Sequence, residues 1–390
     1  MRFIRHNSLT MNELPFRQHH LLLLLEDYDK QQLPLDLCIS LYFRANKALG
    51  SKDRGYVAEA VYALVRWKGL LDYLSNTPNP SWTSRFEILA DIDLPKIQED
   101  ESIPLHIRLS FPKTLFDLII SSYGLDKAAD ICFASNFPAP TTVRANALKI
   151  TRDQLLERWQ GSYEVLPTQN APHGIVFRKK INFFDLPEFK EGFFEVQDEG
   201  SQLLAGLIKA KPGQWIMDYC AGSGGKTLAF APALETKGQI FLHDIRPQAL
   251  FEAKKRLRRA GIQNAQIVRP DDAEKFKKLK KKMDWVLVDA PCSGTGTLRR
   301  NPDMKWNFNE EALGRLVSQQ RVIFERALSF LKPGGTIVYA TCSLLRAENQ
   351  DQLDHFLKTY NLELVEAPFI SVPSRHGMDG FFAATMRVIS

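Results

Sequence analysis

The spacing of apolar residues divides the chain into regions of different periodicity. In the first ~130 residues apolar positions recur at helical spacing, as in the stripe of Val57, Val61, Leu64 and Val65. The leucine run at residues 21–25 is far shorter than a membrane span and indicates a buried helix face. A further helix is predicted from near Ser110 to Gly124. We therefore expect an all-helical N-terminal region.

The pattern changes after this region. Short β-type runs at residues 141–144 and 175–177, set among charged residues, Pro and Gly, predict a small α+β segment. From residue 193 strands and helices alternate, which predicts an α/β domain with a doubly wound parallel sheet covered on both faces. Its ligands are expected beyond the carboxyl ends of the strands. The predicted strands are residues 215–218, 240–244, 265–268, 284–289 and 336–340.

Length and charge add little to this picture. A chain of 390 residues favours two or three domains, and we predict boundaries that give 1–136, 137–192 and 193–390. The net charge of +6, with 51 Lys and Arg against 45 Asp and Glu, allows nucleic-acid binding without arguing for it. The lysine-rich run at residues 275–282 is interpreted as a solvated helix face, with a phosphate-contacting patch as the alternative.

The five cysteines are an odd number at wide spacings, without a C-x-x-C pair. This pattern argues against a structural zinc site and a disulfide framework, and favours a reducing compartment. Residues 1–7 begin with charge but lead into no signal-peptide apolar core. We expect a cytoplasmic, monomeric protein without metal or membrane attachment.

A glycine-rich loop, DYCAGSGGKT at residues 218–227, follows the first predicted strand. A phosphate-binding P-loop needs glycine where this chain has Cys220, and a strict G-x-G-x-x-G needs glycine where it has Thr227. What remains is a loop suited to the methionyl and ribose parts of S-adenosylmethionine. The predicted loop contacts are Cys220, Ala221, Gly222, Ser223, Gly224, Gly225 and Lys226.

Acidic residues close the strands that follow. Asp244 lies 22 residues after Gly222, a spacing suited to an acid that binds ribose hydroxyls; capping the helix before Pro247 is the alternative, and both can hold. Asp272 follows the third strand, where an acid can accept from the adenine amino group. For Asp272 the alternative, a helix cap, is the stronger interpretation. Asp289 ends the fourth strand.

Two cysteines also follow strand ends, in DAPCSGTG (289–296) and YATCS (339–343). A lone cysteine is usually a small core hydrophobe, and that interpretation suits Cys38 and Cys132. It suits Cys292 and Cys342 poorly, because pockets form where strands end. Two such thiols, 50 residues apart, need a chemical explanation.

Methylation of cytosine at C5 supplies that explanation. C5 is too weak a nucleophile to take a methyl group from a sulfonium, but a thiolate that adds at C6 makes C5 enamine-like. A carboxylate near N3 or N4, for which Asp289 is the candidate, stabilises the activated ring. Lys226 is placed to lower the thiol pKa or to orient the base. A base within folded RNA must also leave its stack.

These residues resemble the Nop/Sun family of RNA cytosine-5 methyltransferases. The matching blocks are residues 218–227, DAPCSGTGTLRRNPDMKW (289–306), YATCSLLRAEN (339–349) and FEVQDEGS (194–201). The resemblance implies that Cys342 is the nucleophile and that Cys292 assists product release. It also implies S-adenosylmethionine binding by the glycine loop and by Asp244, Asp272 and Asp289. The residues alone leave open which thiol attacks, since DNA cytosine methyltransferases use the cysteine of the P-C pair.

The N-terminal third, with DRG at residues 53–55 leading into residues 57–67, resembles the NusB-type RNA-binding domain of bacterial Sun/Fmu enzymes. Those enzymes methylate a cytosine in small-subunit ribosomal RNA, which the resemblance implies as the substrate. Two other functions fit these residues less well. A methyltransferase for a protein or small molecule needs no paired thiols. A catalytically silent RNA-binding scaffold need keep neither the glycine loop nor Asp289 and both thiols.

Overall fold

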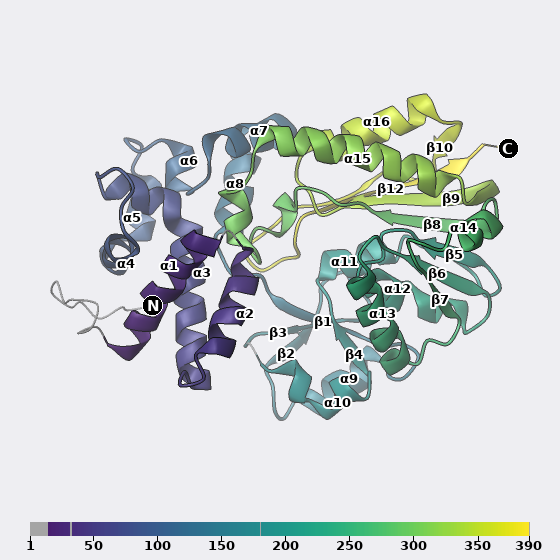
Figure 1. Ribbon diagram of the computed structural model, residues 1–390, viewed down its shortest axis with the longest axis horizontal. Helices are drawn as coiled ribbons and strands as arrows, with labels where there is room; N and C mark the ends of the chain where they lie inside the picture. Colours follow the sequence, from purple (N-terminus) through teal and green to yellow (C-terminus); the bar gives the residue numbers. More distant parts are fainter. Residues whose placement is uncertain (1–14, 32, 180, 390) are drawn as a thin grey trace. The chain divides into compact units, whose positions relative to one another are not determined.

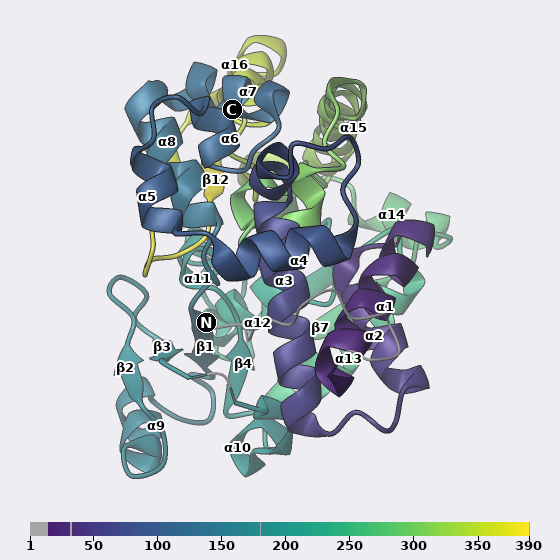
Figure 2. The same ribbon diagram turned by 90° about the vertical axis from the view of Figure 1, so that its left-hand side faces the viewer.

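The apolar stripe of residues 57–65 becomes the centre of a helical unit. In the computed structural model, which describes residues 15–31, 33–179 and 181–389, α3 (Ser51–Leu74) buries this stripe completely. The helices α1 (Phe16–Gln31) and α4 (Trp82–Asp91) pack against α3 (Figure 2). The leucine run of α1 lies in the same core, as predicted. Residues 1–7, where the sequence shows no leader core, lie outside the described residues.

The predicted helix before Gly124 is α7 (Lys113–Tyr123). It begins after Ser110, whose φ of +53° is incompatible with a right-handed helix, and ends at Gly124 with φ +78°. The other helices of this region are α2 (Leu35–Ala45), α5 (Leu94–Glu99), α6 (Leu105–Arg108) and α8 (Leu125–Ser135).

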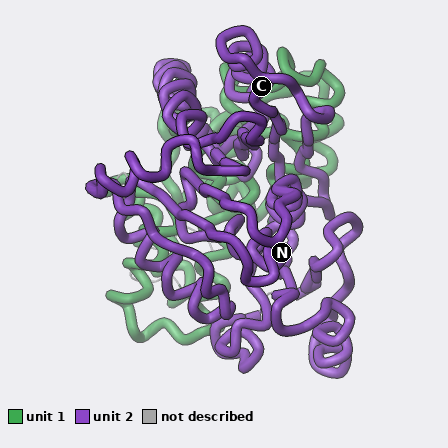
Figure 3. The backbone as a smooth tube through the Cα atoms, turned by 90° about the vertical axis from the view of Figure 1, so that its right-hand side faces the viewer, with its two compact units in different colours: residues 1–138, 298–309 green, residues 139–297, 310–390 purple. Residues whose placement is uncertain are grey.

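The helical unit also contains a segment from far along the chain. Figure 3 shows the two units, residues 1–138 with 298–309 and residues 139–297 with 310–390. Within the 298–309 segment, which includes the short 3₁₀ helix η5 (Pro302–Lys305), Trp306 lies against Gly69 of α3 and donates to Val65 O at 2.7 Å. The three-domain division predicted from the sequence is finer than these two units and stays a prediction.

The second unit begins with a four-stranded antiparallel sheet in the order β2-β3-β1-β4. The predicted strands are β1 (Thr141–Ala145) and β3 (Gly174–Phe177). Two short strands, β2 (Val165–Pro167) and β4 (Phe194–Val196), complete the sheet. Half of the buried residues in its core are aromatic, and the rings of Trp159 and Phe194 lie 5.2 Å apart. Its helices are α9 (Arg152–Trp159) and α10 (Pro187–Lys190).

An eight-stranded sheet follows, with the path β10-β12-β9-β8-β5-β6-β7 and β11 paired to β12. All five predicted strands are present and mutually parallel, which confirms the α/β prediction. They are β5 (Trp215–Asp218), β6 (Gln239–His243), β7 (Ala265–Val268), β8 (Met283–Asp289) and β9 (Leu331–Thr341).

The prediction of a parallel sheet is wrong at one edge. The strand β12 (Phe381–Val388) runs antiparallel to β9, and β10 (Leu362–Leu364) and β11 (Phe369–Ser371) run antiparallel to β12. Between β11 and β12 the chain turns back through a short loop rather than a helix, so the pairing is antiparallel. The residues of β12 form an apolar run, and this pattern does not indicate whether the strand pairs parallel or antiparallel with its neighbours.

Helices cover both faces of this sheet, as Figure 1 shows. One core lies under α11 (Glu199–Ala205), α12 (Gly225–Phe230) and α13 (Pro247–Ala260). The other lies under α14 (Ala273–Leu279), α15 (Glu310–Leu328) and α16 (Gln350–Thr359). Because β5, β6, β8 and β9 are parallel, their carboxyl ends lie together along one edge of the sheet. In the described part of the chain, no helix combines the length and apolarity that crossing a membrane requires.

Candidate active site

The glycine loop after β5 is tied to the strands on both sides. Tyr219 N donates to Leu287 O of β8 at 2.9 Å, and Ala221 N donates to His243 O of β6 at 2.8 Å. Gly222 and Gly224 have φ values of +52° and +79°, a left-handed conformation that glycine adopts without strain. The loop then enters α12 at Gly225. The loop therefore follows a parallel strand and precedes a helix, as the sequence predicted.

Asp244 supports the loop from the end of β6. Its Oδ2 accepts from Gly222 N at 2.8 Å, and its Oδ1 accepts from the backbone and side-chain nitrogens of Arg246, each at 2.9 Å. Burial acts to raise the pKa of Asp244, but the hydrogen bonds from Arg246 and Gly222 outweigh it and lower the pKa. The capping alternative is wrong, because Arg246 is the N-cap residue of α13.

Asp272 does act as a helix cap. Its Oδ1 accepts from Lys275 N at 3.0 Å and so begins α14, the stronger interpretation drawn from the sequence. Most lysines of residues 275–282 are exposed, which agrees with a solvated face. Cys220, in the glycine loop, has a raised pKa because burial disfavours its thiolate.

Asp218 is a candidate site residue to which the sequence alone assigned no role. The carboxyl is buried; Oδ2 accepts from Thr227 Oγ1 at 2.7 Å, whereas Oδ1 has no hydrogen-bond partner among the described residues. Burial raises the pKa of Asp218 to about 7. An unpartnered buried carboxyl oxygen beside a glycine loop suits a positively charged ligand group.

The two strand-end thiols meet in the structure. β8 and β9 are parallel neighbours in which Asp289 lies opposite Ala340. The segments that follow the two strands therefore begin side by side at the same edge of the sheet. Cys292 Sγ and Cys342 Sγ lie 3.4 Å apart, and all five cysteines are free thiols. The sequence predicted the two strand ends, and the register explains why they coincide.

A lysine–aspartate pair lies beside the thiols. Lys226 Nζ of α12 donates to Asp289 Oδ2 at 2.5 Å. Burial acts to lower the pKa of Lys226, but the attraction of Asp289, with a smaller contribution from Cys342, raises it. Lys226 is therefore a stable cation close to Cys342. The predicted residues Lys226, Asp289, Cys292 and Cys342 thus form one cluster.

The environment of Cys292 favours the neutral thiol. The contact with Cys342, burial and the nearby Glu348 all raise the pKa of Cys292 well above its usual value. Sequence reasoning did not single out Glu348, which is completely buried and accepts from Ser293 and Ser343. Its only sequence signal is a charged residue within the block 339–349.

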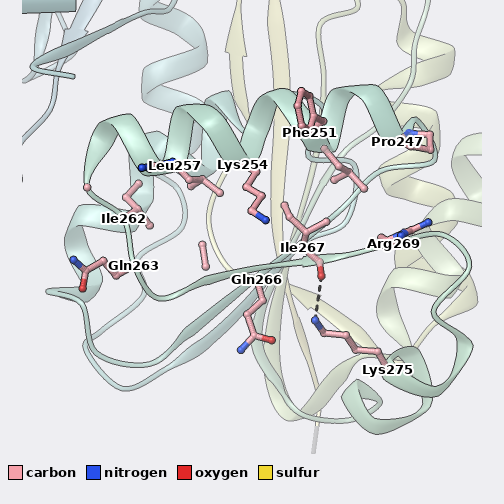
Figure 4. Close-up of a pocket in the computed structure, with 14 residues that line it drawn as sticks. Pro247, Phe251, Lys254, Leu257, Ile262, Gln263, Gln266, Ile267, Arg269 and Lys275 are labelled. Atoms are coloured by element: carbon pink, nitrogen blue, oxygen red, sulfur yellow. Dashed lines mark hydrogen bonds between the residues drawn. The ribbon is translucent and has the colours of Figure 1, made fainter. Parts of the chain in front are cut away.

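A separate groove lies between α13 and β7 (Figure 4). Its lining includes the apolar side chains of Leu257 and Ile267 and the cationic side chains of Lys254, Arg269 and Lys275. None of the predicted catalytic residues lines it, so it is distinct from the thiol cluster. Among the described residues, no group of three or more His, Cys, Asp and Glu side chains is arranged to hold a metal ion.

Comparison with known proteins agrees with this architecture. Residues 205–387 match the family described as 16S rRNA methyltransferase RsmB/F, and residues 111–183 match the ferredoxin-like domain of RsmF/B-like methyltransferases. The probable ribosomal RNA small subunit methyltransferase B of Synechocystis is 30% identical over 75% of this chain and 70% of its own length. The chain belongs to the RsmB/F family of methyltransferases. The predicted Sun/Fmu resemblance is thereby confirmed.

Two further matches extend this assignment. Ribosomal RNA small subunit methyltransferase B of Proteus mirabilis is 31% identical over 77% of this chain and 70% of its own length. The crystal structure of NSun6 from Pyrococcus horikoshii with SFG shares the fold, with a TM-score of 0.63 and 21% identity over 72% of this chain and 99% of that one. The RsmB/F-family chain uses S-adenosylmethionine as its cofactor, as predicted. The residues around the glycine loop fit this cationic ligand, because Oδ1 of Asp218 is a buried acceptor without a partner among the described residues.

Proposed function

We propose that the chain methylates C5 of a cytosine in small-subunit ribosomal RNA through a covalent bond between Cys342 and C6 of the base. The observation that carries this proposal is the pair of thiols 3.4 Å apart beside the Lys226–Asp289 ion pair. Methyl transfer to nitrogen or oxygen requires no thiol, whereas C5 methylation requires a nucleophile and a means of releasing it. The names of the two relatives support the choice of RNA, since one is named ribosomal RNA small subunit methyltransferase B and the other a probable enzyme of that name.

The residues that would hold S-adenosylmethionine surround the glycine loop. The backbone of residues 220–225 can approach the ligand closely because Gly222 and Gly224 have no side chain there. Asp218 and Asp244 present carboxylates on either side, and Asp272 remains a candidate for the adenine end. When bound, S-adenosylmethionine supplies the methyl group that C5 receives.

Cys342 is the proposed nucleophile. Its thiolate forms a bond from Sγ to C6, and the C5–C6 π electrons move onto C5, which then takes the methyl group. Lys226, which Asp289 holds in place, is the cation that interacts electrostatically with Cys342. Asp289 and Lys226 together hold the ring through N3 and the N4 amino group, where charge changes during addition.

Cys292 is proposed to act in product release. After methyl transfer the C5 proton leaves to solvent water, the C5–H electron pair forms the C5=C6 double bond, and Sγ of Cys342 departs from C6 as a thiolate. Because the environment of Cys292 favours its neutral thiol, Cys292 suits donation of a proton to this departing thiolate better than attack. Its sulfur touches that of Cys342, within reach of the bond that breaks.

The other two regions are proposed to bind the RNA. The helical region 1–136 would act as a NusB-like domain, and the small α+β segment 137–192 would guide the strand toward the catalytic domain 193–390. An RNA-binding role predicts that affinity falls with rising salt as phosphate contacts are lost.

The test is bisulfite sequencing of ribosomal and transfer RNA from cells that contain or lack the protein. We expect one 5-methylcytosine in small-subunit ribosomal RNA that disappears without the protein and is restored by the wild-type chain. C342A should fail to restore it, while C38A, which changes a buried cysteine of the helical unit, should succeed. An unchanged map of 5-methylcytosine, or full restoration by C342A, would overturn the proposal.

A further inference from the structure

Glu348 lies at the centre of a hydrogen-bond network beneath the two thiols. Its carboxylate is completely buried and has four donors. Oε1 accepts from Ser293 N at 2.8 Å and from Gln320 Nε2 at 3.0 Å. Oε2 accepts from Ser293 Oγ and Ser343 Oγ, each at 2.5 Å. Both carboxylate oxygens are thus satisfied without water.

All of these donors are neutral. In the part of the chain that the structure describes, no lysine or arginine forms an ion pair with Glu348. A buried carboxylate without a cation is costly, and it is stable only when its donors are fixed in the right geometry. Conversely, the carboxylate fixes its donors, because two hydroxyls and a backbone N–H all converge on it.

Three of the four donors belong to the residues that directly follow the thiols. Ser293 follows Cys292, and Ser343 follows Cys342. The two serine hydroxyls also lie 3.2 Å from each other, and Gly296 N donates to Cys342 O at 2.9 Å. The thiol-bearing loops are therefore joined at a point one residue away from each sulfur.

We propose that Glu348 is the positioning residue that sets the distance between the thiols of Cys292 and Cys342. This inference rests on the proposed function for its catalytic meaning, since thiol spacing matters only if both sulfurs serve the same base. It acts through Ser293 and Ser343, which transmit its position to the two loops. The carboxylate of Glu348 is itself held by Gln320, whose Nε2 donates to it and whose Oε1 accepts from Tyr339 Oη at 3.1 Å.

The direct test measures thiol spacing without RNA. Diamide takes one hydrogen from each of two thiols and joins the sulfurs, and the reaction requires them to approach from 3.4 Å to about 2.05 Å. We expect the Cys292–Cys342 disulfide, quantified by mass spectrometry of the linked peptides, to form about tenfold more slowly in E348Q, because loosened loops lower the effective concentration of one thiol near the other. Gln keeps the shape but turns one acceptor into a donor that faces two hydroxyls.

The matched control is E199Q. Glu199 is also a buried glutamate with donors from the backbone, at Asn170 N and Ala171 N, but it contacts neither thiol loop. We expect E199Q to cross-link at the wild-type rate. Both variants should bind S-adenosylmethionine with wild-type affinity, and their melting temperatures should agree within a few degrees.

A second readout separates positioning from general stability. On RNA, E348Q should lower kcat about tenfold or more with little change in KM, and S343A should cost little further activity in the E348Q background. Wild-type cross-linking in E348Q would overturn the inference, as would a loss of cofactor binding and melting temperature in step with activity. Because cross-linking needs no substrate, a failure of the proposed function alone would leave that result intact.

Discussion

Two buried ions, one in each unit, are stabilised in the same way but serve different parts of the molecule. Glu348, in the unit of residues 139–297 and 310–390, is surrounded by neutral hydrogen-bond donors. Lys305 in the helical unit is 1% exposed and surrounded by neutral acceptors. Its Nζ donates to Arg66 O and Asn136 Oδ1, each at 2.8 Å, and lies 4.5 Å from the ring centroid of Phe111.

The sign of each charge follows from its surroundings. The thiol loops offer hydroxyl and backbone N–H groups, which need an anion, whereas α3 offers a carbonyl and the aromatic rings offer their negative faces, which need a cation. Glu348 joins two loops that carry reactive groups, so disturbing it should change a rate. Lys305 joins the 298–309 segment to the helices, so disturbing it should change stability.

The largest expected effect lies on the catalytic side. C292A should lower multiple turnover by about 10²-fold or more, because a proton-transfer group is lost after the covalent bond has formed. A protein–RNA adduct that survives denaturant should accumulate, and denaturing gel electrophoresis with labelled RNA measures it. If C342A accumulates the adduct instead and C292A does not, the two thiols have the reverse roles.

Replacing Lys305 should affect stability by about 3 kcal/mol. K305A leaves Asn136 and a helix carbonyl unpaired next to a cavity, so the free energy of unfolding should fall by about that amount. K305M fills the same space without the charge and should stay within about 1 kcal/mol of wild type. Urea unfolding of the full chain, with hydrogen exchange of α3, measures both. Equal stability of K305A and wild type would show that the cation contributes no net stabilisation.

Lys305 should also make stability depend on pH. Burial lowers the pKa of Lys305 well below 10.5, so between that lowered pKa and 10.5 the unfolded state binds more protons than the folded one. Stability should therefore rise with pH through this window, relative to K305M, which lacks the group. Urea unfolding from neutral to alkaline pH gives the difference between the two proteins. A constant difference would contradict the lowered pKa.

The smallest effect concerns the packing of the 298–309 segment on α3. A Cβ at Gly69 would lie 2.7 Å from the Trp306 ring, which its hydrogen bond to Val65 holds in place. Steric strain should cost G69A about 2 kcal/mol, and the higher helix propensity of alanine should return about 1 kcal/mol. The free energy of unfolding should therefore fall by about 1 kcal/mol. G55A on the same helix meets nothing within 4 Å and should be stabilised slightly. Melting temperatures compare the two, and equal values would argue against this packing.

Sequence reasoning reached the sheet and the thiols because local patterns specify them. β5 and β8 are apolar runs that end in Asp218 and Asp289, and parallel neighbours bring their ends together. It missed β12, whose partner β9 is set by long-range pairing. It also missed Glu348 and the burial of Lys305, since both depend on partners far away in the sequence: Ser293 is 55 residues from Glu348, and Arg66 is 239 residues from Lys305.

The excursion of residues 298–309 has a consequence for how the protein is made. The chain passes between the two units three times, after residues 138, 297 and 309. During synthesis the helices of residues 15–138 leave the ribosome well before Lys305 and Trp306, which follow residue 138 by about 170 residues. The surface of α3 around Gly69 and Val65, which Trp306 contacts, therefore stays uncovered until the chain has been synthesised beyond the loop that carries Cys292. Completion of the helical core and assembly of the thiol pair thus belong to the same late stage of folding.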